Sequence, residues 1–171
     1  VPGTKERDVS MPVAGDTGAN LTIALGHLTR TLPSIFESPD RYEYRITNAF
    51  AEPHSKKIGT FRSEAKVSEI RNSENVRRVI EELDGCKLAI LCGRRAQLLS
   101  ADVKHSGIAV IHAWHTGNRA LIAKYRGGQV ASESTPDRRR QVRALLWAKD
   151  LEAQCSSAWG LIVAPSGRRN G

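Results

Sequence analysis

Apolar residues recur along the chain in two alternating patterns, one with helical spacing and one as short strand-like runs. Helical spacing predicts a helix over residues 18–31, a second that begins at Asn72 or Ser73, and a third over residues 118–125. Pro136 is expected to begin a last long helix, because proline suits the first helical position. A short helix is also expected directly after Gly93. Helices therefore recur along the whole chain.

Four short runs between these helices predict strands. Residues 42–46 alternate apolar and charged side chains, as on a half-buried strand. Residues 86–92 and 107–114 are nearly continuous apolar runs, typical of parallel strands that are covered on both faces. Residues 159–165 form one more such run. Because strands and helices alternate, we expect a single α/β domain over residues 1–171, with three layers and a short, mostly parallel central sheet.

The balance of charge favours an anionic partner. The chain has 26 Lys and Arg residues against 18 Asp and Glu residues, a formal net charge of +8. Arginine binds pairs of phosphate oxygens well, and a solvated basic surface is the alternative interpretation. The cations expected to bind nucleic acid lie in the basic loop 51–67 and near helix starts: Lys56, Lys57, Arg62, Arg94, Arg95, Arg119, Arg138, Arg139 and Arg140.

The cysteine content and the hydropathy of the chain indicate in which cellular compartment to expect the protein. Three cysteines cannot all pair within one chain, which favours a reducing cytoplasm. No apolar stretch approaches the roughly 20 residues that span a bilayer, so we expect a soluble, intracellular protein with no membrane partner. His112 and His115 lack further ligands at zinc-finger spacing, and we therefore expect neither a metal site nor a cofactor.

Polar motifs follow one another in a fixed order, each beside an apolar run. They are Pro2-Gly3 with Pro12-Val13-Ala14-Gly15, Gly18-Ala19-Asn20-Leu21, Ile46-Thr47-Asn48, Ala89-Ile90-Leu91-Cys92-Gly93 with Arg94-Arg95-Ala96, and His115-Thr116-Gly117. In this order they resemble the motifs of the uracil-DNA glycosylase superfamily, over about residues 2–125. The resemblance implies the fold of that family and the excision of a base from DNA by hydrolysis of its N-glycosidic bond, with the nucleotide flipped into a pocket.

The resemblance also implies roles for particular residues. His115 is expected to stabilise the negative charge that develops on the leaving base, and the alternative is a loop histidine that holds the backbone. Asn48 is expected to read the base edge, because an amide both donates and accepts, and the alternative is a turn residue after a strand. Gly3, Val13 and Gly15 are expected to line the base pocket with Asn48.

Two features of the chain depart from the family pattern, namely the residue before Pro2 and the strand expected ahead of it. Val1 stands before Pro2, where family members carry an acid or Asn that positions the attacking water. Asp8, Asp16 and Glu6 are candidates to replace it, and we place Asp8 in the catalytic set. The family also begins with an apolar strand ahead of Pro-Gly. We expect residues 160–165 to take that central strand position, either within the chain or by exchange between chains.

Trp114 precedes His115 and shares a face of the predicted strand with His112. It can pack in the core or stack on a base, and we favour packing in the core. For the whole chain, the leading hypothesis is a DNA glycosylase-like protein. The alternatives are a non-catalytic nucleic-acid-binding protein with a glycosylase fold, and a hydrolase of the N-glycosidic bond in free nucleosides or nucleotides.

Overall fold

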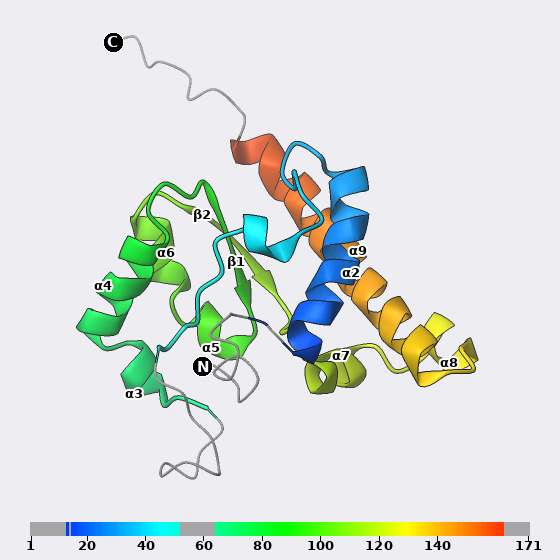
Figure 1. The fold of residues 1–171 in the computed structure, drawn as a ribbon. Coiled ribbons are helices and arrows are strands. Elements are labelled where there is room, and N and C mark those ends of the chain that lie inside the picture. The colour runs from blue at the N-terminus through cyan, green and yellow to red at the C-terminus, as the bar shows by residue number, and fades with distance from the viewer. Residues whose placement is uncertain (1–12, 14, 52–63, 163–171) are drawn as a thin grey trace.

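The computed structural model describes residues 13, 15–51 and 64–162, with the backbone alone for 158–162. In this part of the chain the fold is mixed α/β and mostly helical (Figure 1). Two strands, β1 (Leu88–Cys92) and β2 (Ala109–Ala113), form a parallel sheet in which Leu88 pairs with Ala109 and Cys92 with Ala113. The helical elements are α2 (Asp16–Thr31), η1 (Arg41–Glu43), α3 (Val67–Ile70), α4 (Ser73–Glu82), α5 (Arg94–Gln97), α6 (Ser100–His105), α7 (Asn118–Lys124), α8 (Gln129–Ser132) and α9 (Pro136–Ile162).

The two faces of this short sheet meet two separate hydrophobic clusters. Side chains alternate between faces along a strand, so that Ile90 joins the cluster of α2, α7 and α9, whereas Ala89 and Leu91 join the cluster of α3, α4 and α6. Figure 1 shows the same division, with α2 and α9 on one side of the strands and α4 and α6 on the other. The predicted α/β class is therefore confirmed at this coarse level.

Helices α2 and α9 form the largest helix–helix contact, and small side chains allow it. Ala24 and Leu28 on α2 are fully buried, as are Ala148 and Leu151 on α9. Their spacing of four and three residues puts each pair on one helix face. At the margin of this interface, the Nε2 atom of His27 lies 2.9 Å from a carboxylate oxygen of Glu152. The two helices thus brace one face of the sheet.

Most of the predicted elements are confirmed. Helix α2 begins at Asp16, two residues before its predicted start, and α9 begins at Pro136. Helix α4 begins at Ser73, where the side chain of Asn72 accepts a hydrogen bond from the main-chain N–H of Glu74 at 2.9 Å. Both strands lie inside their predicted apolar runs, because those runs are short, continuous and bounded by turn residues.

The strand predicted over residues 42–46 is wrong. Residues 41–43 form η1, whose N-terminus is capped by the carboxylate of Asp40 accepting from Tyr42 N at 3.0 Å, and an irregular segment follows. The carbonyl groups of Asn48 and Ala49, just beyond, accept hydrogen bonds from side chains of α4. Partners on a distant helix therefore replace the neighbouring strand that an alternating pattern predicts.

The strand predicted over residues 159–165 is also wrong in its first part. Helix α9 continues through Ile162, so residues 160–162 do not supply a central strand, and the exchange of such a strand between chains has no basis in them. Residues 163–165 lie outside the described residues. Periodicity cannot distinguish a short apolar strand from the end of a buried helix, and here the long helix continues.

Among the helices that the structure describes, none is both long enough and apolar enough to cross a membrane.

Candidate functional site at the carboxyl end of the sheet

His115 lies just beyond the end of β2, in a space that two glycines leave open. A Cβ on Gly93 would lie 3.1 Å from the Cβ of His115, and a Cβ on Gly117 would lie 2.9 Å from its Nδ1. The main-chain N–H of Gly93 donates to the carbonyl of Ala113 at 2.8 Å, which joins the ends of the two strands. The histidine thus stands where ligands meet parallel sheets, outside the carboxyl ends of the strands.

A hydrogen bond sets the tautomer of the His115 ring. The main-chain N–H of Gly117 donates to Nδ1 at 2.9 Å. Because Nδ1 accepts, the neutral imidazole carries its hydrogen on Nε2, which is then a donor. His115 is exposed, so a ligand can approach it. This bond also makes His115 a loop histidine that holds the backbone, which is compatible with a chemical role for Nε2.

A buried asparagine ties this loop to helices α2 and α9. Asn20 on α2 is 1% exposed, and its Nδ2 donates to the Thr116 carbonyl at 2.8 Å and to Oδ1 of Asn118 at 3.0 Å. Its Oδ1 accepts from Nε of Arg140 at 2.8 Å. Sequence reasoning assigned Asn20 no role, although it lies four residues before Ala24 on the apolar face of the helix, an unusual place for a polar residue.

Asp16 brings a carboxylate to the same loop. Its Oδ2 accepts from Nδ2 of Asn118 at 2.9 Å, and its Oδ1 lies 4.0 Å from a guanidinium nitrogen of Arg140. The side chain of Asp16 is 61% exposed and remains accessible to water. Asp16 is therefore the candidate acid that the structure ties to Asn118, three residues after His115, whereas Asp8 and Glu6 lie outside the described residues.

Two of the candidate pocket residues, Val13 and Gly15, lie at the start of α2. Val13 adopts a positive φ of 49°, and the carbonyl of Gly15 accepts from the N–H groups of Gly18 and Ala19. Gly18 packs directly beneath Val13, because a Cβ on Gly18 would lie only 1.7 Å from the Val13 carbonyl oxygen. Figure 1 places the start of α2 at the same end of the molecule as α5 and α7. Gly3 lies outside the described residues.

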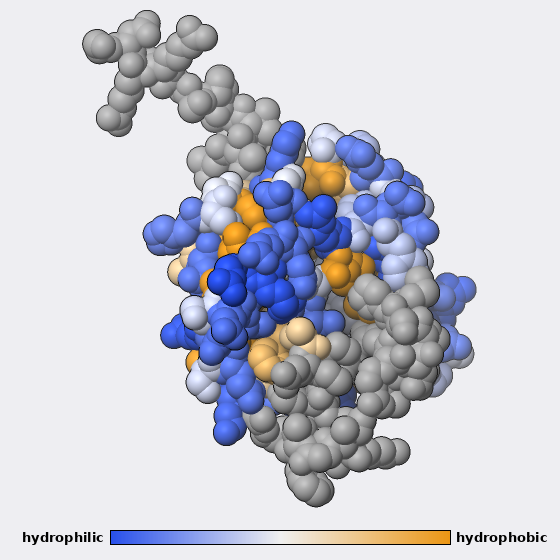
Figure 2. All heavy atoms as spheres, turned by 60° about the vertical axis from the view of Figure 1, so that its left-hand side comes forward, coloured by the Kyte–Doolittle hydropathy of each residue, from blue (hydrophilic) through white to orange (hydrophobic). Residues whose placement is uncertain are grey.

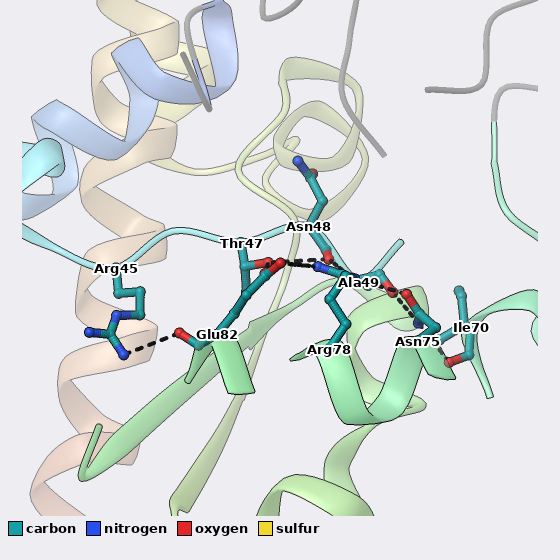
Figure 3. A network of polar contacts seen from close by, with 8 residues as sticks. All are labelled: Arg45, Thr47, Asn48, Ala49, Ile70, Asn75, Arg78 and Glu82. Carbon is teal, nitrogen blue, oxygen red and sulfur yellow. Dashed lines mark hydrogen bonds and ion pairs between the residues drawn. The ribbon is translucent and has the colours of Figure 1, made fainter. Parts of the chain in front are cut away.

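Asn48 is held by its backbone and directs its side chain elsewhere. Nη2 of Arg78 donates to the Asn48 carbonyl at 2.9 Å, and Nδ2 of Asn75 donates to the carbonyls of Ala49 and Ile70, each at 2.9 Å. Figure 3 shows the Asn48 amide pointing away from this network. The prediction that Asn48 ends a strand is wrong. Side chains of α4, and not a strand, hold the backbone of Asn48 and Ala49.

An ion pair within α4 holds Arg78, which is the donor to the Asn48 carbonyl. Nη1 of Arg78 lies 2.7 Å from a carboxylate oxygen of Glu82, whose other oxygen accepts from the hydroxyl of Thr47 (Figure 3). Burial raises the pKa of Glu82, but the hydrogen bonds from Thr47 and Arg78 and the charge of Arg78 outweigh burial and lower it below its ordinary value. Arg45 adds a bond to the Glu82 carbonyl at 3.2 Å.

The predicted nucleic-acid-binding cations divide into engaged and exposed groups. Arg140 belongs to the Asn20 network, Arg95 pairs with Glu64 at 3.3 Å, and Arg139 donates to the Ser134 carbonyl at 3.3 Å. The exposed members are Arg94, Arg119 and Arg138. Arg94 directly follows Gly93, and Arg119 directly follows Asn118, so both adjoin the His115 loop. The remaining members, Lys56, Lys57 and Arg62, lie outside the described residues.

The prediction that Trp114 packs in the core is wrong. Its side chain is 44% exposed, whereas Trp147 of α9 is 3% exposed and takes the core position. The indole N–H of Trp147 donates to the Trp114 carbonyl at 2.8 Å. His112, two residues earlier, contacts the Ser100 hydroxyl at 2.8 Å, and the described residues contain no group of three or more side chains arranged to hold a metal.

Figure 2 shows one face that is largely hydrophilic, with separate apolar patches between the charged side chains. No protein-family model matches the chain, and no curated protein or solved structure matches it either. The geometry around His115 is therefore the basis on which a function is assigned.

Proposed function

We propose that this chain is a DNA glycosylase-like enzyme that hydrolyses the N-glycosidic bond of a damaged or modified base. The observation that carries the proposal is the His115 ring, which lies outside the strand ends and whose Nδ1 accepts from Gly117, so that Nε2 carries the hydrogen of the neutral imidazole. Two core clusters on opposite faces of the parallel pair support the three-layer glycosylase-like arrangement as part of this proposal.

In the proposed reaction, water attacks the sugar carbon while the bond from that carbon to the base nitrogen breaks. The base leaves with the electron pair, and negative charge spreads to its carbonyl oxygen. A hydrogen bond from Nε2–H of His115 to this oxygen would stabilise the leaving group, since a donor aimed at developing charge lowers the barrier. The base then takes up a proton, and the water oxygen remains on the sugar.

Among the residues that the structure describes, Asp16 is the carboxylate that we assign to act on the attacking water or on the sugar. The bond from Asn118 orients it, and its Oδ1 lies 4.0 Å from a guanidinium nitrogen of Arg140. A carboxylate here can accept the proton of the attacking water and offset positive charge on the sugar ring. Asn48 would read the base edge, and the bond from Arg78 to its main-chain carbonyl supports that role by fixing the backbone from which the amide projects.

A non-catalytic nucleic-acid-binding protein is the second candidate. Arg94 and Arg119 favour it, because both are exposed and both adjoin the His115 loop. Such cations bind phosphate whether or not chemistry follows, and binding through several of them weakens steeply with salt. A hydrolase of free nucleosides is the third candidate, and it requires no such salt dependence.

A base-release assay tests the proposal. Oligonucleotides that carry uracil, hypoxanthine, xanthine or modified cytosines are incubated with the wild type, His115→Ala and Asn48→Ala. We expect release of one base that falls by more than about tenfold in each variant. The matched controls are His105→Ala, an exposed histidine of α6, and Gln141→Ala, an exposed amide of α9. Salt-sensitive binding without release of any base would favour the second candidate.

A further inference from the structure

A cavity of about 430 Å³ lies beside the end of β2, bounded by α5, α7 and α9. Its walls include Gly93, Arg94, Trp114, Lys124, Tyr125 and Asp150. His115 is not among the described residues that line it, yet Gly93 borders both the cavity and His115. This volume falls within the range of roughly 300–1,000 Å³ that is usual for small-molecule sites. The cavity is therefore a neighbour of the proposed active site and distinct from it.

An exposed indole forms one wall of this cavity. Trp114 is 44% exposed although its carbonyl is fixed by the indole N–H of Trp147 at 2.8 Å. The Nζ of Lys124 lies 5.4 Å from the centre of the Trp114 ring. The main chain at Trp114 thus presents a large aromatic ring with a cation over one face, and the other face of the ring is the one on which a base would stack. A ligand with a flat ring and an anionic group matches that pair.

The charged groups of the cavity favour an anion and add a polar contact. Arg94 and Lys124 contribute two positive charges, against the single negative charge of Asp150. The Tyr125 hydroxyl donates to Asp150 at 2.7 Å. Burial first, and then Asp150, raises the pKa of Tyr125, so the hydroxyl stays protonated and remains a donor. A carboxylate accepts several hydrogen bonds, so Asp150 can also accept from an amino or sugar hydroxyl group of a ligand.

We propose that this cavity binds a nucleotide, with its base stacked on Trp114 and its phosphate facing Arg94 and Lys124. The nucleotide is either a free mononucleotide or one unit of a single strand, and both share the same recognition chemistry. The second source rests on the proposed function, because a strand whose target nucleotide lies at His115 would pass Gly93 and place a neighbouring nucleotide in the cavity.

Calorimetric titration of the whole chain tests this site with three probes, namely deoxyadenosine monophosphate, a short oligo(deoxyadenylate) and inorganic phosphate. We expect Trp114→Leu to weaken nucleotide binding by about fivefold or more, because stacking on one aromatic side chain contributes strongly for each base. Lys124→Gln is expected to weaken binding by a smaller factor and to reduce its salt dependence. Trp114→Leu keeps the main-chain carbonyl that Trp147 binds, so the core contact survives the substitution.

The chain offers matched controls for both variants. Tyr42→Leu removes another exposed aromatic ring beside a cation, since the Arg41 guanidinium lies 4.4 Å from its centre, and Lys149→Gln removes an exposed lysine of α9. Both are expected to bind as the wild type does. Binding of the mononucleotide identifies a free ligand, and binding of the oligomer alone identifies a strand unit.

Nucleotide binding that is unchanged in Trp114→Leu, or no stronger than that of inorganic phosphate, would overturn the site. The outcome stays separate from the proposed function, because binding is also measured in His115→Ala, which is expected to retain it. Base release without nucleotide binding in the cavity would reject this site alone. Trp114-dependent binding without base release would reject the proposed function alone.

Discussion

The Nδ1 atom of His115 accepts a hydrogen bond from the main-chain N–H of Gly117, at 2.9 Å. A side chain at position 117 would collide with the same ring, because a Cβ there would lie 2.9 Å from Nδ1 and 3.2 Å from Cε1. Gly117 has φ −67° and ψ 145°, a conformation that alanine adopts without strain. Glycine at position 117 therefore leaves room for the imidazole ring, and its backbone conformation does not require glycine.

Gly117→Ala is expected to displace the His115 ring while leaving the fold intact. Base release should fall by about tenfold or more, whereas the free energy of unfolding should stay within about 0.5 kcal/mol of the wild type. Gly127→Ala is the matched control, because a Cβ there meets no atom within 4 Å. Normal release by Gly117→Ala would show that the position of His115 does not matter to the chemistry.

Two glycines of helix α2 should respond in opposite directions to alanine. Gly26→Ala is expected to stabilise the protein by about 0.5–1 kcal/mol, since its Cβ would meet nothing within 4 Å and alanine favours helix. Gly18→Ala is expected to destabilise it by about 1–3 kcal/mol, because the Cβ would collide with the Val13 carbonyl. Urea unfolding measures both. Equal effects would mean that Val13 moves away without cost.

Removal of the buried amide of Asn20 should cost about 2–3 kcal/mol. Asn20→Ala leaves the Arg140 Nε and the Thr116 carbonyl without their partner in a buried place, and unpaired polar groups there are expensive. Thermal and urea unfolding provide the measurement, with the exposed amide of Gln154 as control in Gln154→Ala. A loss below about 0.5 kcal/mol would indicate that water replaces the amide readily.

The Glu82 carboxylate should make the free energy of unfolding depend on pH. Its folded-state pKa is lowered below the ordinary value of 4.5, so its contribution is present above pH 4.5 and is lost as the pH falls through the folded-state pKa. Because the side chain is 41% exposed, solvent screening limits the contribution to below about 1 kcal/mol.

Comparison of Glu82→Gln with the wild type checks this prediction. The difference in unfolding free energy should be measurable at pH 7 and should shrink below pH 4.5. Glu81→Gln is a matched control, since Glu81 pairs with Arg77 at 3.9 Å on the same helix and both side chains are well exposed. A difference for Glu82→Gln that grows as the pH falls would reverse the assigned sign.

Two thiols should resist alkylation in the folded protein, that of the buried Cys155 and that of the partly buried Cys92. Burial raises the pKa of Cys155 to about 11 and that of Cys92 to about 12, and the thiolate is the reactive form. We expect iodoacetamide at neutral pH to leave both unlabelled, as mass spectrometry would show, until urea unfolds the chain. Cys86 serves as the internal reference, being partly exposed. Rapid labelling of folded Cys155, which is 1% exposed, would mean that α9 separates readily from its neighbours.

The sequence was sufficient for those features whose physical causes are local. The runs that became β1 and β2 are short, apolar and bounded by turns, and the helices carry apolar residues at helical spacing with Asn72 or Pro136 at their starts. The position of His115 also followed locally, because it comes directly after a predicted strand. The tautomer of its ring did not, because it depends on the folded turn at Gly117.

Tertiary structure alone decided the features whose partners are distant in sequence. The segment after Glu43 is irregular because α4, some 30 residues later, donates to the carbonyls of Asn48 and Ala49. Trp114 is exposed because Trp147 occupies the core and holds its carbonyl. Local pattern reports what a segment can form, but the choice between strand and loop, or between core and surface, depends on which groups the fold brings to it. In this chain, groups from distant segments decided the surroundings of Asn48 and formed the cavity beside His115.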